Sequence, residues 1–269
     1  MMLAGAALAV ATPAAAQSLT DTLRAFRSTV GQLTGKRPAT ATPAAHSDPA
    51  TAAADPLDAM LAGEPDSALA AMPVRPRDAS TFDVAGYKLG MSPREAVRIA
   101  RARKVRANMT LNAGTWEAQA RTKANLSLSD DLKVRGRTLS NYNGVAPDGS
   151  TSQVSFIATP QGTQVSSLYY VTPSQGQTPD AILQAMIARY GPPTRRDPIY
   201  NGVVATWCGV DRECANEIHS TNDYLKATIT TTDTTMFLHR SGKFHRAMTT
   251  ALDAYAAKLA GQNAKPVAF

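Results

Sequence analysis

The sequence lacks the short motifs that identify the common enzyme classes. It has no G-x-S-x-G nucleophile elbow and no glycine-rich phosphate-binding loop. It contains only four histidines, and Asp130, Asp131 and Asp253 form no evident acid–base pair. We expect His239 and His245 to be surface residues, and we predict no catalytic residue, no cofactor and no metal. These absences favour a non-enzymatic binding module. The alternative is a small secreted, hydrolase-like enzyme whose site is not visible in the sequence.

No apolar run is long enough for a membrane-spanning helix, which needs roughly 20 residues. The nearest is the uncharged, Ala-rich stretch from Met1 to Gln17, and Pro13 interrupts it. It ends in Ala14-Ala15-Ala16, which is typical of a signal-peptide cleavage site, and no cysteine lies nearby to carry a lipid. We therefore predict that residues 1–16 are a signal peptide and that the mature protein, with no transmembrane segment, is periplasmic or secreted.

Only two cysteines are present, Cys208 and Cys214, within WCGVDRECANEIH. Outside the cytoplasm we predict that they form a disulfide, which stabilises the fold by about 2 kcal/mol when the closed loop is short. Two alternatives stay open. One is a redox dithiol, although its usual spacing is the tighter C-x-x-C. The other is a zinc site that recruits His219 with Asp211 or Glu213.

Large apolar side chains are scarce in residues 36–80, which consist mainly of Ala, Pro, Thr and Asp. So few large apolar side chains cannot offset the conformational entropy lost on folding, which costs about 1–2 kcal/mol per residue. We therefore predict a disordered Ala/Pro-rich linker. Before it, residues 17–35 are predicted to form a short amphipathic helix, because apolar residues recur at steps of four and three. This stripe could pack on the protein's own domain, on a partner or on a second copy. It consists of Leu19, Leu23, Phe26, Val30 and Leu33.

Positive charge exceeds negative charge, with a formal net charge of +7. The densest cationic run lies between residues 94 and 106, and two interpretations are open. The cations can complement the C-terminal dipole of a helix, or they can form a patch for an anionic partner such as phospholipid headgroups, lipopolysaccharide or an acidic protein. Nucleic acid is not expected, because no stacking aromatics lie nearby. The run consists of Arg94, Arg98, Arg101, Arg103, Lys104 and Arg106.

Two segments carry strong helix-start signals, and strand-like runs follow each. Ser92-Pro93-Arg94-Glu95 has the pattern of a capping box and predicts a helix to about Arg103. Thr178-Pro179-Asp180 predicts a second helix that ends at Gly191. Strands are expected at 152–158 and 163–171, joined by a turn at Thr159–Gly162, and again at 203–209 and 224–240. Further helices are expected at 115–123 and 244–261, and a strand within 126–142.

The run Tyr87-Lys-Leu-Gly-Met-Ser-Pro-Arg-Glu-Ala resembles the x-LGM-[ST]-x-x-E motif of the BamE (SmpA/OmlA) family of outer-membrane lipoproteins. Tandem-repeat relatives such as the β-lactamase inhibitory proteins are similar too. The later ILQAMIARYGPPTRR segment looks like the second repeat of small exported proteobacterial proteins. The resemblance covers residues 82–240 and implies a non-enzymatic binding module of the cell envelope. We therefore predict an α+β fold of two helix-then-antiparallel-strands units, residues 81–175 and 176–262, the second ending in the C-terminal helix.

Overall fold

The computed structural model describes residues 67, 73–111, 113–208 and 220–263. All of them belong to one compact unit, which spans Ala53–Phe269. The predicted signal peptide, the stripe Leu19–Leu33 and Cys214 lie outside the described residues, and so does most of the predicted linker.

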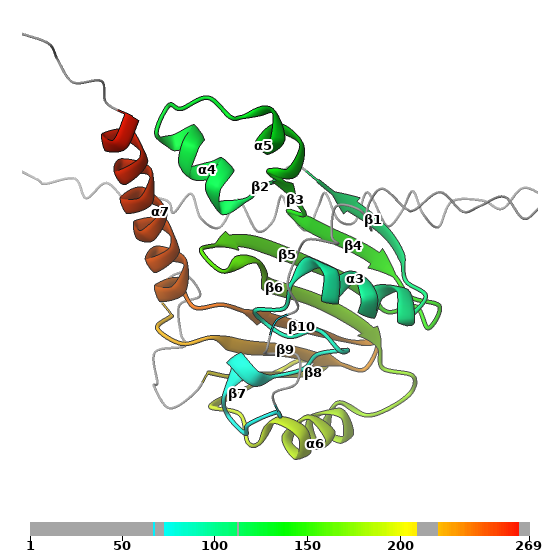
Figure 1. Ribbon diagram of the computed structural model, residues 1–269. Helices are drawn as coiled ribbons and strands as arrows, with labels where there is room; N and C mark the ends of the chain where they lie inside the picture. Colours follow the sequence, from blue (N-terminus) through cyan, green and yellow to red (C-terminus); the bar gives the residue numbers. More distant parts are fainter. Residues whose placement is uncertain (1–66, 68–72, 112, 209–219, 264–269) are drawn as a thin grey trace, which may run out of the picture. The chain divides into compact units, whose positions relative to one another are not determined.

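Eight strands form one antiparallel sheet in the order β1-β4-β5-β6-β10-β9-β8-β7 (Figure 1). Its two central strands are β6 (Gly162–Pro173) and β10 (Asp233–His239), which pair directly with each other. The other strands are β1 (Arg106–Thr110), β4 (Asn141–Val145), β5 (Thr151–Thr159), β7 (Arg195–Ile199), β8 (Gly202–Trp207) and β9 (Tyr224–Thr230).

The predicted division into two helix-then-strands units is wrong, because strands from both parts of the chain share this single sheet. The join is made by β6 and β10, which are in register from Pro173–Asp233 to Ser167–His239. An unpaired strand edge leaves backbone N–H and C=O groups without partners, and pairing β6 with β10 removes two such edges. β1 and β7 are left as the outer strands.

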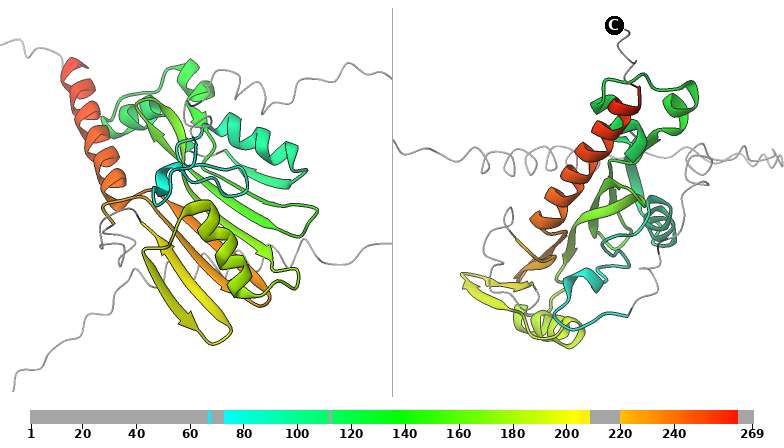
Figure 2. Two further views of the ribbon diagram at one scale, coloured as in Figure 1. Left: turned by 90° about the horizontal axis from the view of Figure 1, so that it is seen from below. Right: turned by 60° about the vertical axis from the view of Figure 1, so that its left-hand side comes forward.

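Two helices, α3 (Pro93–Ala102) and α6 (Pro179–Tyr190), lie on the same face of the sheet (Figure 1 and Figure 2). α3 contacts β6, whereas α6 contacts β8 and β9. At the start of α3, Ser92 Oγ accepts a hydrogen bond from the Glu95 N–H and the Glu95 carboxylate accepts one from the Ser92 N–H, which confirms the predicted capping box. Thr178 caps α6 with a single side-chain bond.

The core lies between this face of the sheet and the two helices. Tyr190 packs on Phe82 with 4.6 Å between ring centroids, and Trp207 is fully buried beside it. The Tyr190 hydroxyl donates to the Asp83 carbonyl at 2.7 Å, and the indole N–H of Trp207 donates to the Gly191 carbonyl at 2.7 Å. Burial raises the pKa of Tyr190 to about 12. The end of α6 is therefore tied to the sheet by aromatic packing whose polar atoms are satisfied.

Residues 73–81 pack on this core and end in the short helix η2 (Ala79–Thr81). Val74 packs against the core, and the Arg77 N–H donates to the Tyr190 carbonyl at 2.9 Å. These contacts fasten the chain next to the end of α6.

The segment 126–142 contains a helix, α5 (Asp130–Arg135), where we expected a strand. Ser129 Oγ accepts a hydrogen bond from the Leu132 N–H, and two aspartates follow in the first helical turn. The strand prediction is wrong for these residues. The N-cap satisfies a backbone N–H of the first helical turn, and this favours a helix over the strand that the short alternating pattern indicated. Extended structure is confined to the short strand β3 (Arg137–Thr138), which pairs with β2 (Ala113–Gly114), and to β4.

Two further helices, α4 (Trp116–Lys123) and α7 (Gly242–Asn263), contact each other (Figure 2). Lys123 pairs with Asp253 across this contact. We call α4, α5 and the facing part of α7 the helical lobe. Few of its side chains are buried: Ala118 and Ala120 in α4, Ala256 in α7 and none in α5.

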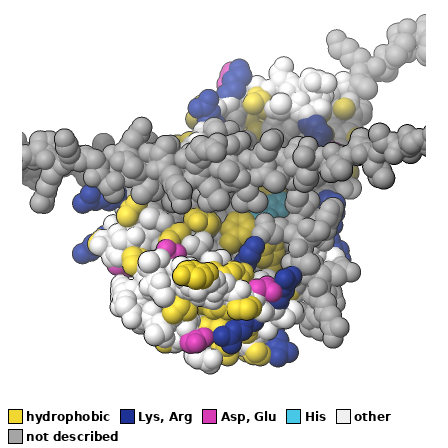
Figure 3. All heavy atoms as spheres, turned by 180° about the vertical axis from the view of Figure 1, so that it is seen from behind, with side chains coloured by type: hydrophobic (Ala, Val, Ile, Leu, Met, Phe, Trp, Pro, Cys, Tyr) yellow, Lys and Arg dark blue, Asp and Glu magenta, His cyan; other side chains and the backbone are white. Residues whose placement is uncertain are grey.

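The opposite face of the sheet carries polar and aromatic side chains, most of them half-buried. The register places one row across six strands, and its members are Asn143, Gln153, Tyr169, Phe237, Lys226 and Thr206. Figure 3, viewed from behind, shows hydrophobic side chains beside charged ones on this side of the molecule.

Candidate functional site

The outer side of α3 is strongly cationic. Arg94, Arg98 and Arg101 are exposed, and their spacing of four and three places them on adjacent turns of one helix face. Glu95 is the only carboxylate of this helix, and it is 4% exposed because it serves the capping box. The Glu95 carboxylate therefore does not lie on the surface that the arginines form.

Arg103 belongs to the interior contacts and not to this surface. Its guanidinium donates to Ser150 Oγ and to the Tyr170 hydroxyl, each at 3.1 Å, and to the Ala85 carbonyl at 3.3 Å. It also lies 5.3 Å from the centre of the Tyr170 ring and 3.8 Å from the Asp148 carboxylate. Arg103 thus connects the end of α3 to the sheet, which is a structural role.

Asp148 completes this connection. Its carboxylate accepts hydrogen bonds from the Ser150 hydroxyl at 2.6 Å and the Ser150 N–H at 2.9 Å. These bonds, with a smaller contribution from Arg103, lower the pKa of Asp148 below its ordinary value. The charge of Arg103 is therefore matched locally.

The other two cations of the predicted patch follow the helix. Lys104 is exposed and has a φ of 54°, and Arg106 is exposed at the start of the outer strand β1. Lys104 occupies the position after the helix cap at which glycine is usual, because a left-handed backbone costs other residues roughly 1–2 kcal/mol. We call the exposed set the arginine face: Arg94, Arg98, Arg101, Lys104 and Arg106.

α6 provides an internal comparison for this surface. It starts with the same N-cap and proline arrangement and packs on the same face of the sheet, yet Asp180 and Arg189 are its only charged residues. Both are paired, since Asp180 lies 3.1 Å from Arg196 and Arg189 lies 3.4 Å from Asp83. Packing a helix on this sheet therefore does not require a row of arginines.

The two histidines near the C-terminal helix lie together, so the expectation that they are plain surface residues is wrong. The rings of His239, at the end of β10, and His245, in α7, are 5.2 Å apart and partly buried. Tyr224 stacks on His239 at 5.7 Å. Nε2 of His245 is buried without a hydrogen-bond partner, and burial followed by the nearby His239 lowers the pKa of His245.

A partly buried ion pair lies beside these rings. Arg240 donates to the Asp223 carboxylate at 2.8 Å, and the Ser241 N–H donates to the same carboxylate at 2.7 Å. The Arg240 guanidinium lies 4.9 Å from the centre of the Phe244 ring. The described part of the chain contains no cluster of three or more His, Cys, Asp or Glu side chains able to hold a metal. The contacts of Asp223 with Arg240 and Ser241 connect the start of α7 to the sheet.

Cys208 follows β8 and is 1% exposed, with its N–H donating to Thr194 Oγ1 at 3.3 Å. Cys214 lies outside the described residues, as do the alternative zinc ligands Asp211, Glu213 and His219. The disulfide between Cys208 and Cys214 stays a prediction.

Comparison with protein-family models, curated proteins and solved structures found no significant match. The resemblance to the BamE family likewise stays a prediction. No helix within the described residues is both long and apolar enough to cross a membrane.

Proposed function

We propose that the protein is an exported, non-enzymatic binding module of the bacterial cell envelope that attaches to anionic lipid headgroups through the arginine face. The observation that carries the proposal is the contrast between α3 and α6. Both helices cover the same face of the sheet, but α3 presents three exposed arginines and no exposed carboxylate along its outer side, whereas α6 carries one aspartate and one arginine. Export rests on the predicted signal peptide.

The expected strength of this attachment follows from the number of cations. Each Lys or Arg near an anionic membrane surface contributes about 1 kcal/mol, and the contribution falls off within a Debye length. The cations of the arginine face together give a useful affinity, although each is worth little alone. Binding must then weaken as salt shortens the Debye length from about 10 Å at 0.1 M to about 3 Å at 1 M.

The test is co-sedimentation of the mature protein with vesicles of phosphatidylglycerol and phosphatidylcholine. The variant R94Q/R98Q/R101Q should lose most of its binding and keep its melting temperature, because exposed charges contribute only about 0–1 kcal/mol each to stability. The control K243Q/R246Q/K258Q removes the same formal charge from exposed positions of α7 and should bind nearly as well as wild type. Equal losses in both variants would show that net charge alone governs attachment, and the proposal would fail.

A further inference from the structure

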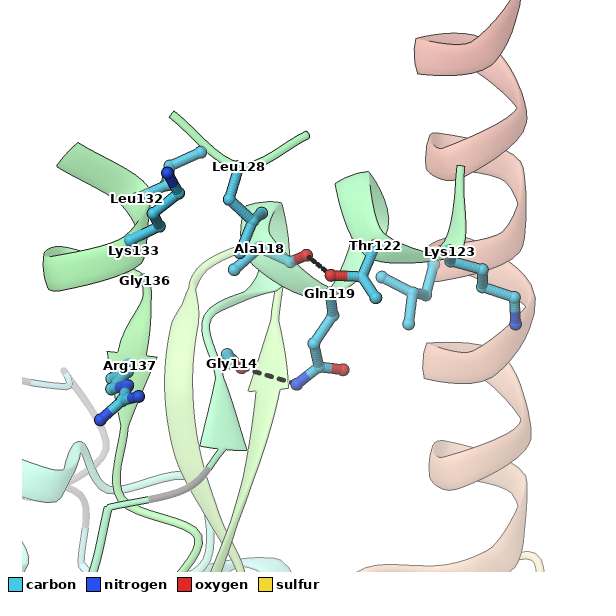
Figure 4. A pocket seen from close by; sticks show the side chains of 11 residues that line it. Gly114, Ala118, Gln119, Thr122, Lys123, Leu128, Leu132, Lys133, Gly136 and Arg137 are labelled. Carbon is cyan, nitrogen blue, oxygen red and sulfur yellow. Dashed lines mark hydrogen bonds between the residues drawn. The ribbon is translucent and has the colours of Figure 1, made fainter. Parts of the chain in front are cut away.

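The helical lobe carries an open groove that is separate from the arginine face. The groove is formed by α4, α5, the turn into β3 and Leu252 of α7, and its volume is about 690 Å³ (Figure 4). Binding sites for small organic molecules usually measure about 300–1,000 Å³, so the space suits a ligand of that size.

The walls of the groove are largely apolar. Ala118, Leu128, Leu132 and Leu252 line it. Its two polar uncharged side chains already have partners: Gln119 donates to the Gly114 carbonyl at 2.6 Å, and Thr122 donates to the Ala118 carbonyl at 2.9 Å. An apolar ligand can therefore cover these walls without leaving a polar group unpaired, which would cost about 1–3 kcal/mol.

Among the described residues, the charged side chains that line the groove are all cationic. Lys123 pairs with Asp253, and Lys133 pairs with Asp130 at 2.7 Å. Arg137 is exposed, and its guanidinium forms no ion pair or hydrogen bond with any described residue. Figure 4 places it on the β3 side of the groove, at the opposite end from Leu128. The groove thus has one uncompensated positive charge at one end and apolar walls toward the other.

We propose that this groove binds a medium-chain fatty acid of about twelve carbons, with its carboxylate on Arg137 and its alkyl chain along Leu132 and Leu128. A planar guanidinium matches a carboxylate with two parallel hydrogen bonds. A small inorganic anion would leave the apolar walls unused, and a neutral lipid would leave Arg137 unused. This site is distinct from the arginine face and does not depend on it.

The packing of the lobe suits a ligand of variable length. α5 has no buried residue, and Val134 within it is 74% exposed. Sparse burial of this kind makes a segment the least stable part of a fold and the easiest to rearrange. The helices around the groove can therefore adjust to an alkyl chain at little cost to the sheet.

The test is calorimetric titration of the delipidated mature protein with laurate and with dodecanol. Laurate should bind with a stoichiometry of one, and R137Q should weaken it by about tenfold or more, because a hydrogen bond to a charged group contributes about 1.5–3 kcal/mol. The same variant should leave dodecanol binding unchanged. The matched control R135Q, an exposed arginine of the same lobe that does not line the groove, should bind laurate like wild type.

A second variant tests the location. T122W fills the groove from an exposed position and should abolish binding of both ligands while the sheet still melts cooperatively. Absence of saturable laurate binding, or equal affinities of R137Q and R135Q, would overturn the proposal. Binding of a synthetic 17–35 peptide that T122W blocks, without laurate binding, would likewise overturn it and assign the groove to that segment.

Discussion

α3 and α6 occupy corresponding places on the two parts of the sheet, and comparing them separates what the fold requires from what it leaves free. Both begin with a capping Ser or Thr followed by Pro, and both bury apolar side chains on the same face of the sheet. They differ in charge, since α3 exposes Arg94, Arg98 and Arg101 whereas α6 carries only Asp180 and Arg189. The shared features are those that packing needs. Packing does not require the arginines of α3, and the proposed function assigns them to binding.

The largest expected effect concerns the shared, buried side of the helices. Leu183 of α6 is fully buried in the core. L183A should lower the free energy of unfolding by about 2–5 kcal/mol, because it removes packed methyl groups and leaves a cavity. Urea denaturation measures the loss. Vesicle binding below the denaturation midpoint should be unchanged, and a parallel loss of binding would contradict the separation of packing from function.

The two caps should differ in strength. Each cap residue contributes about 0.5–2 kcal/mol when replaced by alanine. S92A removes the Oγ that accepts from the Glu95 N–H and leaves this backbone donor without a partner at a buried cap, whereas T178A removes a single exposed bond. Thermal denaturation should therefore show the larger destabilisation for S92A. A larger effect of T178A would show that the capping box does not anchor α3.

Acid should weaken the junction of β10 and α7. His245 faces His239, Arg240 and the Asp223 carboxylate, and its pKa is lower in the folded protein than in the unfolded chain, where it is about 6.5. The unfolded chain therefore binds the proton more tightly, and the free energy of unfolding should fall as the pH drops below about 6.5. H245F keeps a ring at this position and should remove part of that dependence in denaturation curves at pH 7 and pH 5. An identical pH dependence in both proteins would exclude His245 as its source.

The smallest expected effect concerns Lys104. K104G relieves the left-handed strain and should stabilise the fold by up to about 1 kcal/mol. It also removes one cation of the arginine face, so binding to anionic vesicles should weaken by about 1 kcal/mol. N125G is the matched control, because Asn125 follows α4 with a φ of 55° and carries no charge. It should stabilise without weakening binding, and a K104G protein that binds normally would remove Lys104 from the face.

The parts of the fold that the sequence predicted are local. The capping box at Ser92 and Glu95 and the turn between β5 and β6 depend on residues a few positions apart, and the structure confirms both. The N-cap at Ser129 followed by two aspartates was an equally local signal for α5, and the short alternating pattern after it led to the wrong assignment.

The remaining features depend on distant pairing. No local sequence pattern indicates that β6 pairs with β10, and so the single eight-stranded sheet could not be predicted. The same holds for Arg103, which the sequence places with the other cations but which the fold directs to Tyr170 and Ser150. His239 and His245 meet only because α7 starts directly after the central strand β10.

The most direct test of the central claim is the salt dependence of binding to phosphatidylglycerol vesicles, measured for wild type and for R94Q/R98Q/R101Q. We predict that wild-type binding is strong at low ionic strength and falls steeply as salt is raised, because exposed charges are screened. The triple variant should bind weakly at every salt concentration, with a much shallower dependence. Superimposable salt curves for the two proteins, or equal binding to neutral vesicles, would contradict the claim that α3 carries the binding surface.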